Sequence, residues 1–186
     1  MKTFSFLQRA LIMVCLLLVS TVYAQQNFLV DDFEDGDSVN NFYQDVYTIS
    51  TDQENGGNST ASYYLAEGYN SQYAVHVDYT IDRGAYDFDP YVQIYSPIYN
   101  KDLSASSGVS FWYKGPQVFL RAETLNITDY DFYRVEVPAS AEWTEYTFTW
   151  AEFSQQGWGN VADFDLSVFL GLSWQCFGVT GDAGVF

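Results

Sequence analysis

The sequence predicts an all-β protein, an antiparallel β-sandwich of the jelly-roll type. Apolar residues alternate with other residues in several short runs, which is the period of a strand with two different faces. Clusters of Gly, Asn, Asp and Ser separate these runs, as expected for turns between short strands. Aromatic residues, which pack well on sheets, make up 19% of the chain. Helical periodicity after the N-terminal segment is confined to one short candidate at residues 150–156.

The N-terminal segment has the pattern of a secretory signal peptide. Two basic residues flank the start of an apolar run at residues 10–19, and residues 22–24 (Val-Tyr-Ala) form a small-residue cleavage site. We therefore expect a signal peptide at 1–24 and one β-sandwich domain at 25–186. The apolar run is shorter than the roughly 20 residues that cross a bilayer, and no Cys stands at the cleavage point. The protein is expected to be secreted, extracellular or periplasmic, without a membrane anchor.

Five strands are visible after this segment. In the clearest one, at residues 73–81, apolar side chains occupy every odd position. The other four are expected at residues 109–113, 118–122, 133–137 and 166–174. Glycine-bearing turns lie between the runs, at residues 55–57, 82–84, 106–108, 114–116 and 157–159. The Gly-, Ser- and Asn-rich segment at 51–62 is interpreted as a long loop.

The charge balance excludes some classes of partner. The chain has 24 acidic and seven basic residues, for a net charge of −17. Nucleic acids and anionic membranes are poor partners for such a surface, whereas a neutral polymer is not repelled and calcium is attracted. Cys176 is the only Cys after the signal segment, so we expect no intrachain disulfide. We expect a monomer held by a packed core.

Three stretches carry a family resemblance. They are Asp-Asp-Phe-Glu at 31–34, Asp-Leu-Ser at 102–104 with Gly-Val-Ser-Phe at 108–111, and Tyr-Arg-Val-Glu-Val-Pro at 133–138 with Trp-Thr-Glu-Tyr at 143–146. Together they resemble the family 11 carbohydrate-binding modules and the related complex I intermediate-associated protein 30 superfamily, both galactose-binding-like jelly rolls. The resemblance implies a cleft for β-1,4- and mixed-linkage glucans and attachment to an endoglucanase. The family's closing strand would lie beyond Phe186, so we expect this sandwich to lack it.

Trp158 is the strongest candidate for a sugar contact. It stands between Gly157 and Gly159 in a turn, where surface exposure is expected. Sugar rings present C–H groups that pack on the faces of aromatic rings. The resemblance places a stacking Tyr of the family at this position, after the strand end at Phe153. The alternative is a Trp that anchors the loop by packing.

The resemblance implies further sugar contacts, each with a structural alternative. Tyr130 and Asp131 lie where the family supplies a carboxylate to sugar hydroxyls. Trp174 falls near another stacking Tyr of the family, but is as readily a core residue. Similar positions, equally compatible with strand packing, are Tyr91, Tyr43 and Tyr47.

Alternation also pairs charged residues on two strands. It places Arg121 with Glu123 on one face and Arg134 with Glu136 on one face. The forked donors of Arg134 suit sugar hydroxyls. The alternative is a cross-strand ladder of ion pairs among the four residues.

An acidic segment opens the domain. Asp32 and Glu34 are two positions apart, so on a strand both would point to one side while Phe33 points to the core. Hard oxygen ligands suit calcium, and the resemblance implies a structural calcium ion of the kind found in many jelly rolls. The alternative is an acidic loop without a metal.

The function that these observations favour is non-catalytic binding of β-glucan, cellulose-type or mixed-linkage, for an attached or parent endoglucanase. A catalytic role finds little support, because His76 is the only His and the strand motif Glu-x-Asp-x-x-Glu of laminarinase-type enzymes is absent. The alternatives left open are a chain that is itself part of a glycoside hydrolase and a secreted adhesion or assembly module.

Overall fold

The computed structural model describes residues 27–186, except the Asn100 side chain; the expected signal peptide lies outside these residues. All paired strands are antiparallel. The strands are β1 (Thr48–Thr51), β2 (Thr60–Ala66), β3 (Ala74–Thr80), β4 (Tyr91–Lys101), β5 (Gly108–Gly115), β6 (Val118–Thr124), β7 (Tyr133–Val137), β8 (Ser140–Thr149), β9 (Phe169–Phe177) and β10 (Ala183–Val185). Three short 3₁₀ turns complete the set, η1 (Asp52–Asn55), η2 (Trp150–Glu152) and η3 (Leu166–Val168). The all-β prediction is confirmed.

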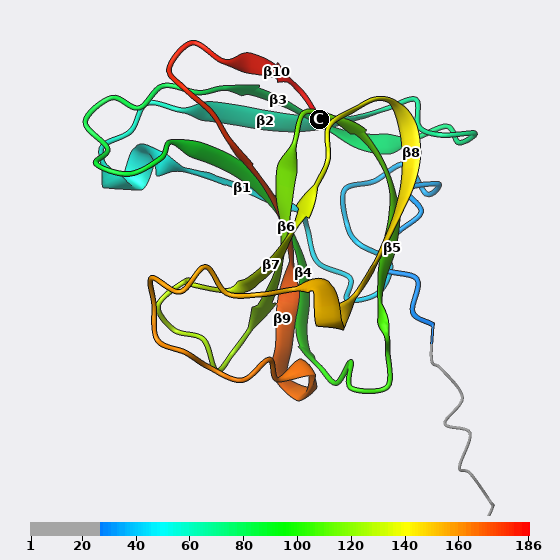
Figure 1. The fold of residues 1–186 in the computed structure, drawn as a ribbon. Helices are drawn as coiled ribbons and strands as arrows, with labels where there is room; N and C mark the ends of the chain where they lie inside the picture. The colour runs from blue at the N-terminus through cyan, green and yellow to red at the C-terminus, as the bar shows by residue number, and fades with distance from the viewer. Residues whose placement is uncertain (1–26) are drawn as a thin grey trace, which may run out of the picture.

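The strands form one large sheet and two small ones. The large sheet has the order β1-β4-β9-β6-β7. One small sheet has the order β10-β3-β2, and the other consists of β5 and β8. In Figure 1 the β10-β3-β2 sheet lies across the top and the β5-β8 pair curves down the right side. Buried apolar residues from all three sheets form a single core cluster.

Alternation along the strands decides which side chains enter this core. In β6, Val118, Leu120 and Ala122 are completely buried and belong to the core cluster. The residues between them, Phe119 and Arg121 among them, therefore point to the opposite face of the large sheet. β3 follows the same rule, because Val77 lies in the core.

Two local expectations from the sequence were wrong. The segment at 51–62 is not one loop, because β1 reaches Thr51, η1 follows, and β2 begins at Thr60. Gly56 makes this compact path possible, since it ends η1 with a φ of 92°, a left-handed conformation that favours glycine. The candidate helix at 150–156 is reduced to η2, which the Thr149 and Glu152 side chains cap.

The expected strand at 166–174 begins later than predicted. Its first three residues form η3, and β9 then runs from Phe169 to Phe177. Asp165 caps η3, accepting a hydrogen bond from the Ser167 N–H. Within residues 27–186 no helix is long and apolar enough to cross a membrane.

Candidate functional site

The face of the large sheet that points away from the core carries two of the candidate residues, Tyr91 and Arg134, and we call it the outer face. The strand register places Arg121 on β6 beside Ser173 on β9, and Ser173 beside Tyr95 on β4. Because side chains alternate, the outer-face residues follow at every second position. They are Tyr91, Gln93, Tyr95, Ser173, Gln175, Phe177, Phe119, Arg121, Glu123, Arg134 and Glu136.

A row of aromatic rings crosses one end of the outer face. The ring centroids of Tyr91 and Phe177 are 6.2 Å apart, and those of Phe177 and Phe119 are 5.9 Å apart. Tyr86, in the loop before β4, extends the row, with its ring 6.3 Å from that of Tyr91. Beyond it, Phe88 is strongly exposed. The row thus joins three strands and one loop into an aromatic platform.

The centre of the outer face is polar and tightly bonded. The Arg121 guanidinium donates hydrogen bonds to the Gln93 amide oxygen at 2.7 Å and to the Tyr130 carbonyl at 3.3 Å. Ser173 donates to a Glu123 carboxylate oxygen at 2.7 Å, and that oxygen lies 4.0 Å from the Arg121 guanidinium. Arg121 is only 8% exposed. These side chains are held in place before any ligand arrives.

The two arginines of this face do not form the ion-pair ladder considered as an alternative. The register sets Arg121 directly opposite Arg134, and sets Glu136 opposite Phe119. Each guanidinium lies instead over a ring, that of Arg134 over Phe119 at 3.8 Å and that of Arg121 over Phe132 at 5.0 Å. Stacked guanidinium groups keep their edge N–H donors free to point sideways. Arg134 therefore places its edge donors beside the aromatic platform, whereas Arg121 donates to Gln93 and to the Tyr130 carbonyl.

Burial has the largest effect on the pKa of Glu123, the carboxylate at the centre of the outer face. It raises the pKa of Glu123, while the nearby Arg121 charge and the Ser173 hydrogen bond lower it in part. Burial also lowers the pKa of Arg121, and the Glu123 charge raises it in part. An acid with a raised pKa in the folded chain stabilises the fold below its unfolded pKa, and that contribution is lost as pH rises through the folded pKa.

This shift leads to an expected result for Glu123→Gln. The amide cannot titrate, so the variant should lack the parent's loss of stability as pH rises from about 4 to about 8. The difference in melting temperature, variant minus parent, should therefore increase over this range, whatever its value at low pH. Thermal melts of both proteins across the range check it. A constant difference would show that Glu123 does not titrate abnormally.

A second aromatic group lies at the far end of β4. The Tyr95 hydroxyl donates to the Leu170 carbonyl at 2.7 Å, and its ring covers Gly171, where a Cβ would lie 2.5 Å from ring carbons. Tyr99 follows, with its ring 6.2 Å from that of Tyr95 and 5.4 Å from that of Tyr43. The two aromatic groups lie on either side of the polar centre. Of the sequence candidates, Tyr91 is thus in the first group and Tyr43 reaches the second.

Trp158 lies in an exposed loop beside β7. Its side chain is 60% exposed, and its indole N–H donates to the Gln156 amide oxygen at 2.7 Å. Tyr130, on the neighbouring loop, is 73% exposed and leads into Phe132 under Arg121. Both exposed rings therefore lie on loops next to the β7 edge of the large sheet.

Asp131 holds this loop rather than facing solvent. It is 2% exposed, and its carboxylate accepts hydrogen bonds from the backbone N–H groups of Gln156, Gly157 and Gly159 at 2.9–3.0 Å. A Cβ at Gly159 would lie 2.7 Å from the Asp131 side chain, so only glycine allows this approach. Asp131, predicted as a sugar contact, is placed here as the support of the Trp158 loop.

Two other candidates lie on the core side of the large sheet. Tyr47 is buried in the core cluster, and its hydroxyl donates to Asp31 at 3.0 Å. Trp174 pairs with Ile94 in the register and packs its ring against that of Phe111, with centroids 5.5 Å apart. Tyr47 and Trp174 therefore both pack on the core side of the sheet, as the structural alternative to a sugar contact had it for each residue.

The predicted calcium site assumed that Asp32 and Glu34 lie on one strand, and the structure does not place them on one. Residues 31–37 form turns and no strand, so Asp32 and Glu34 do not share a strand face. The Asp32 carboxylate accepts the Glu34 N–H at 3.2 Å instead. Within residues 27–186 no three His, Cys, Asp or Glu side chains come together as metal ligands. These two residues thus do not fit a calcium site, and calcium binding itself stays a prediction.

Several outer-face residues were missed by the sequence reasoning. They are Phe119, Phe177, Gln93 and Gln175, and Tyr86 in the loop before β4 was missed with them. The alternation that identified Arg121 also placed Phe119 on its face, so that residue was within reach. The others depend on which strands are neighbours, which short alternating runs do not reveal.

Comparison with known proteins gives one relative in sequence. No family model matches the chain. It is 34% identical over 160 residues to Endoglucanase 3 of Fibrobacter succinogenes (strain ATCC 19169 / S85). The match covers 81% of this chain and 24% of that enzyme, so the chain spans about a quarter of the relative's length.

Solved structures give the fold. The family 11 carbohydrate-binding module of the cellulosomal cellulase Lic26A-Cel5E of Clostridium thermocellum is similar with a TM-score of 0.62 and 17% identity, over 87% of this chain and 90% of that one. A family 11 module from Clostridium thermocellum in complex with a β-1,3-1,4-mixed-linked tetrasaccharide is similar with a TM-score of 0.56 and 14% identity, over 75% and 82%. The chain has the jelly-roll fold of these modules, which confirms the predicted resemblance at the level of the fold.

Proposed function

We propose that the protein is a non-catalytic carbohydrate-binding module that binds a single β-glucan chain along its outer face. The observation that carries the proposal is the pairing, on the sheet face that points away from the core, of an aromatic row with fixed arginine and amide groups. Tyr91, Phe177 and Phe119 supply ring faces for sugar C–H groups. Arg134 supplies a forked donor for hydroxyls, and the Gln93 amide, whose oxygen accepts from Arg121, supplies its NH₂ group.

The chemistry of this face suits a neutral polymer. Two of the chain's seven basic residues lie here, each stacked on a ring, and Arg134 is a forked donor that matches hydroxyl oxygens. The Tyr95 ring is fixed by its own hydrogen bond, so little side-chain entropy is lost on binding. Trp158 and Tyr130 extend the proposed site beyond β7.

Mixed-linkage glucan is our proposed ligand. A similar module was solved in complex with a mixed-linked tetrasaccharide, and the relative in sequence is an endoglucanase. We infer from the same likeness that the protein serves to bring an endoglucanase, attached or separate, to its polysaccharide. Secretion follows from the signal pattern and belongs to the same proposal.

Affinity electrophoresis tests the proposal. The protein is run in native gels that contain barley β-glucan, hydroxyethylcellulose, xylan or mannan, beside a gel without polymer. We expect retardation in the two β-glucan gels and no release of reducing sugar on incubation with the same polymers. Unretarded migration in both would contradict glucan binding, and sustained hydrolysis by pure protein would favour the glycoside hydrolase alternative.

Arg134→Lys tests the role of the stacked guanidinium. Lysine keeps the charge but loses the planar fork, so affinity for β-glucan should fall about tenfold, the equivalent of one charged hydrogen bond. The fold should persist, since a cation over a ring contributes only about 0.5–1 kcal/mol at such sites. Isothermal titration with a mixed-linkage oligosaccharide measures it. Arg83→Lys, in an exposed ion pair with Asp89, is the matched control and should bind like the parent.

A further inference from the structure

The loop that joins β3 to β4, which we call the β3–β4 loop, extends the aromatic row of the outer face beyond the sheet. On the sheet the row passes from Phe119 on β6 through Phe177 on β9 to Tyr91 on β4. In the loop, the Tyr86 ring lies 6.3 Å from that of Tyr91, and the Phe88 ring lies 5.6 Å from that of Tyr86. The row therefore continues without a break from the sheet to Phe88.

The position of the β3–β4 loop keeps the row running in one direction. The Ala85 N–H donates to the Gly56 carbonyl at 2.8 Å, and Gly56 ends η1, the turn that follows β1. In the large sheet β1 lies on the side of β4 opposite to β9. The row thus crosses the sheet from β6 toward its β1 edge, and Phe88 lies at the end of the row.

A buried carboxylate fixes both ends of this loop. Asp52 is completely buried, and its carboxylate accepts hydrogen bonds from the Ser59 hydroxyl at 2.7 Å and from the Tyr91 N–H at 3.3 Å. The Ser59 oxygen in turn accepts the Asp82 N–H at 3.0 Å. Asp82 lies near the start of the loop and Tyr91 directly follows it. Because the loop is held in this way, a ligand that binds its rings pays little for ordering it.

Phe88 has the surroundings of a ligand contact rather than of a packing residue. It is 71% exposed, although Tyr86 beside it is half-buried. The neighbouring Asp87 is also exposed, and an ionised carboxylate accepts hydrogen bonds from hydroxyl groups. An aromatic face for sugar C–H groups and an acceptor for sugar hydroxyls therefore lie next to each other at the end of the row.

We propose that Phe88 forms an additional sugar subsite at the β1 end of the outer face and gives the protein a preference for glucan chains longer than a tetrasaccharide. This inference rests on the proposed function, because Phe88 continues the same row of rings. The ring spacings along the row are comparable with the length of one sugar unit, so successive rings meet successive sugars. Arg134 lies over Phe119 at the opposite end and holds a short oligosaccharide there, so only a longer chain reaches Phe88.

Isothermal titration with a mixed-linked tetrasaccharide and a mixed-linked hexasaccharide tests the proposal. The parent should bind the hexasaccharide about tenfold more tightly than the tetrasaccharide, a gain of the size that one further stacked ring gives. Phe88→Ala should lose this gain and still bind the tetrasaccharide like the parent. Phe88→Tyr keeps the ring and should retain the gain.

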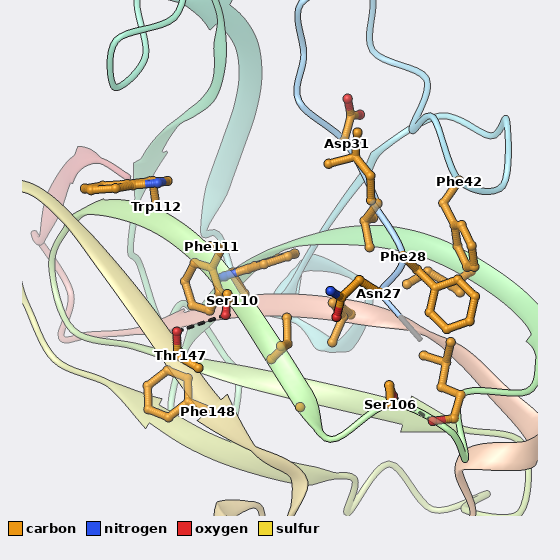
Figure 2. Close-up of a pocket in the computed structure, with 18 of the residues that line it drawn as sticks. Asn27, Phe28, Asp31, Phe42, Ser106, Ser110, Phe111, Trp112, Thr147 and Phe148 are labelled. Carbon is orange, nitrogen blue, oxygen red and sulfur yellow. Dashed lines mark hydrogen bonds between the residues drawn. The ribbon is translucent and has the colours of Figure 1, made fainter. Parts of the chain in front are cut away.

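Trp112→Ala is the matched control. Trp112 is also an exposed aromatic residue, but it belongs to β5. Figure 2 shows it with Phe111 and Phe148 around a cavity on the core side of the large sheet, away from the outer face. The control should keep the parent's preference for the hexasaccharide.

Three results would overturn the subsite. They are equal affinity of the parent for the two sugars, a preference for the hexasaccharide that persists in Phe88→Ala, and an equal loss of affinity for both sugars in that variant. Each of these results leaves tetrasaccharide binding by the parent standing. A parent that binds neither sugar would contradict the proposed function itself, and the subsite with it.

Discussion

Trp158→Ala should weaken binding to β-glucan about ten- to a hundredfold while leaving the fold intact. The exposed indole offers a flat apolar face, and losing one stacked ring costs on the order of 1–3 kcal/mol, the scale measured for bases stacked on aromatic side chains. Its one hydrogen bond is to Gln156 at the surface, so the free energy of unfolding should change by no more than about 0.5 kcal/mol. Isothermal titration and thermal melting measure the two quantities separately.

Trp158→Tyr is the control for this effect. A smaller flat ring at the same place should retain much of the affinity, because stacking depends on ring area more than on the indole N–H. A Trp that served only to anchor its loop would behave differently, since Trp158→Ala would then lower stability. Full glucan affinity in Trp158→Ala would place the bound chain away from this loop.

Asp131→Ala should have the largest effect on stability, because three backbone N–H groups lose their acceptor at once. Hydrogen bonds to a charged group contribute about 1.5–3 kcal/mol each, but water can reach part of the exposed loop after the change. We therefore expect the free energy of unfolding to fall by about 2–4 kcal/mol. Glucan affinity should fall as well, since the loop that positions Trp158 loses its support.

Asp131→Asn separates shape from hydrogen bonding. The amide has the same size, but in either orientation its NH₂ group faces at least one of the backbone N–H donors. This variant should therefore be destabilised nearly as much as Asp131→Ala. Urea unfolding of the three proteins makes the comparison. A stable Asp131→Asn with parental binding would show that the carboxylate does not organise the loop.

The sequence predicted the fold well where strands alternate clearly and poorly where they are short. The runs at β3, β6 and β7 show a strict period of two, and the structure confirms all three. β1 has only four residues, three of them Ser or Thr, so no periodicity could mark it. β2 follows so closely on η1 that their polar residues were interpreted as one loop.

The candidate site was predicted in part, and the misses have physical causes. The glycines beside Trp158 indicated a turn, and the exposure of Trp158 follows from that local chemistry. The Asp131 carboxylate is buried because it accepts hydrogen bonds from backbone N–H groups some 25 residues away, and the local sequence does not show this pairing. Alternation along the strand showed which residues share a face with Trp174, but not whether that face meets the core. The answer depends on the pairing of Trp174 with Ile94 on a distant strand.

The measurement that tests the outer-face proposal most directly is NMR titration of the labelled protein with a β-1,3-1,4-mixed-linked tetrasaccharide. We expect the largest chemical-shift changes at backbone amides of β4, β9, β6 and β7, around Gln93, Gln175, Arg121 and Arg134, with further changes in the Trp158 loop. Amides of β2, β5 and β8 should change little. Shifts centred on those three strands, or no shifts at millimolar sugar, would contradict a glucan site on the outer face.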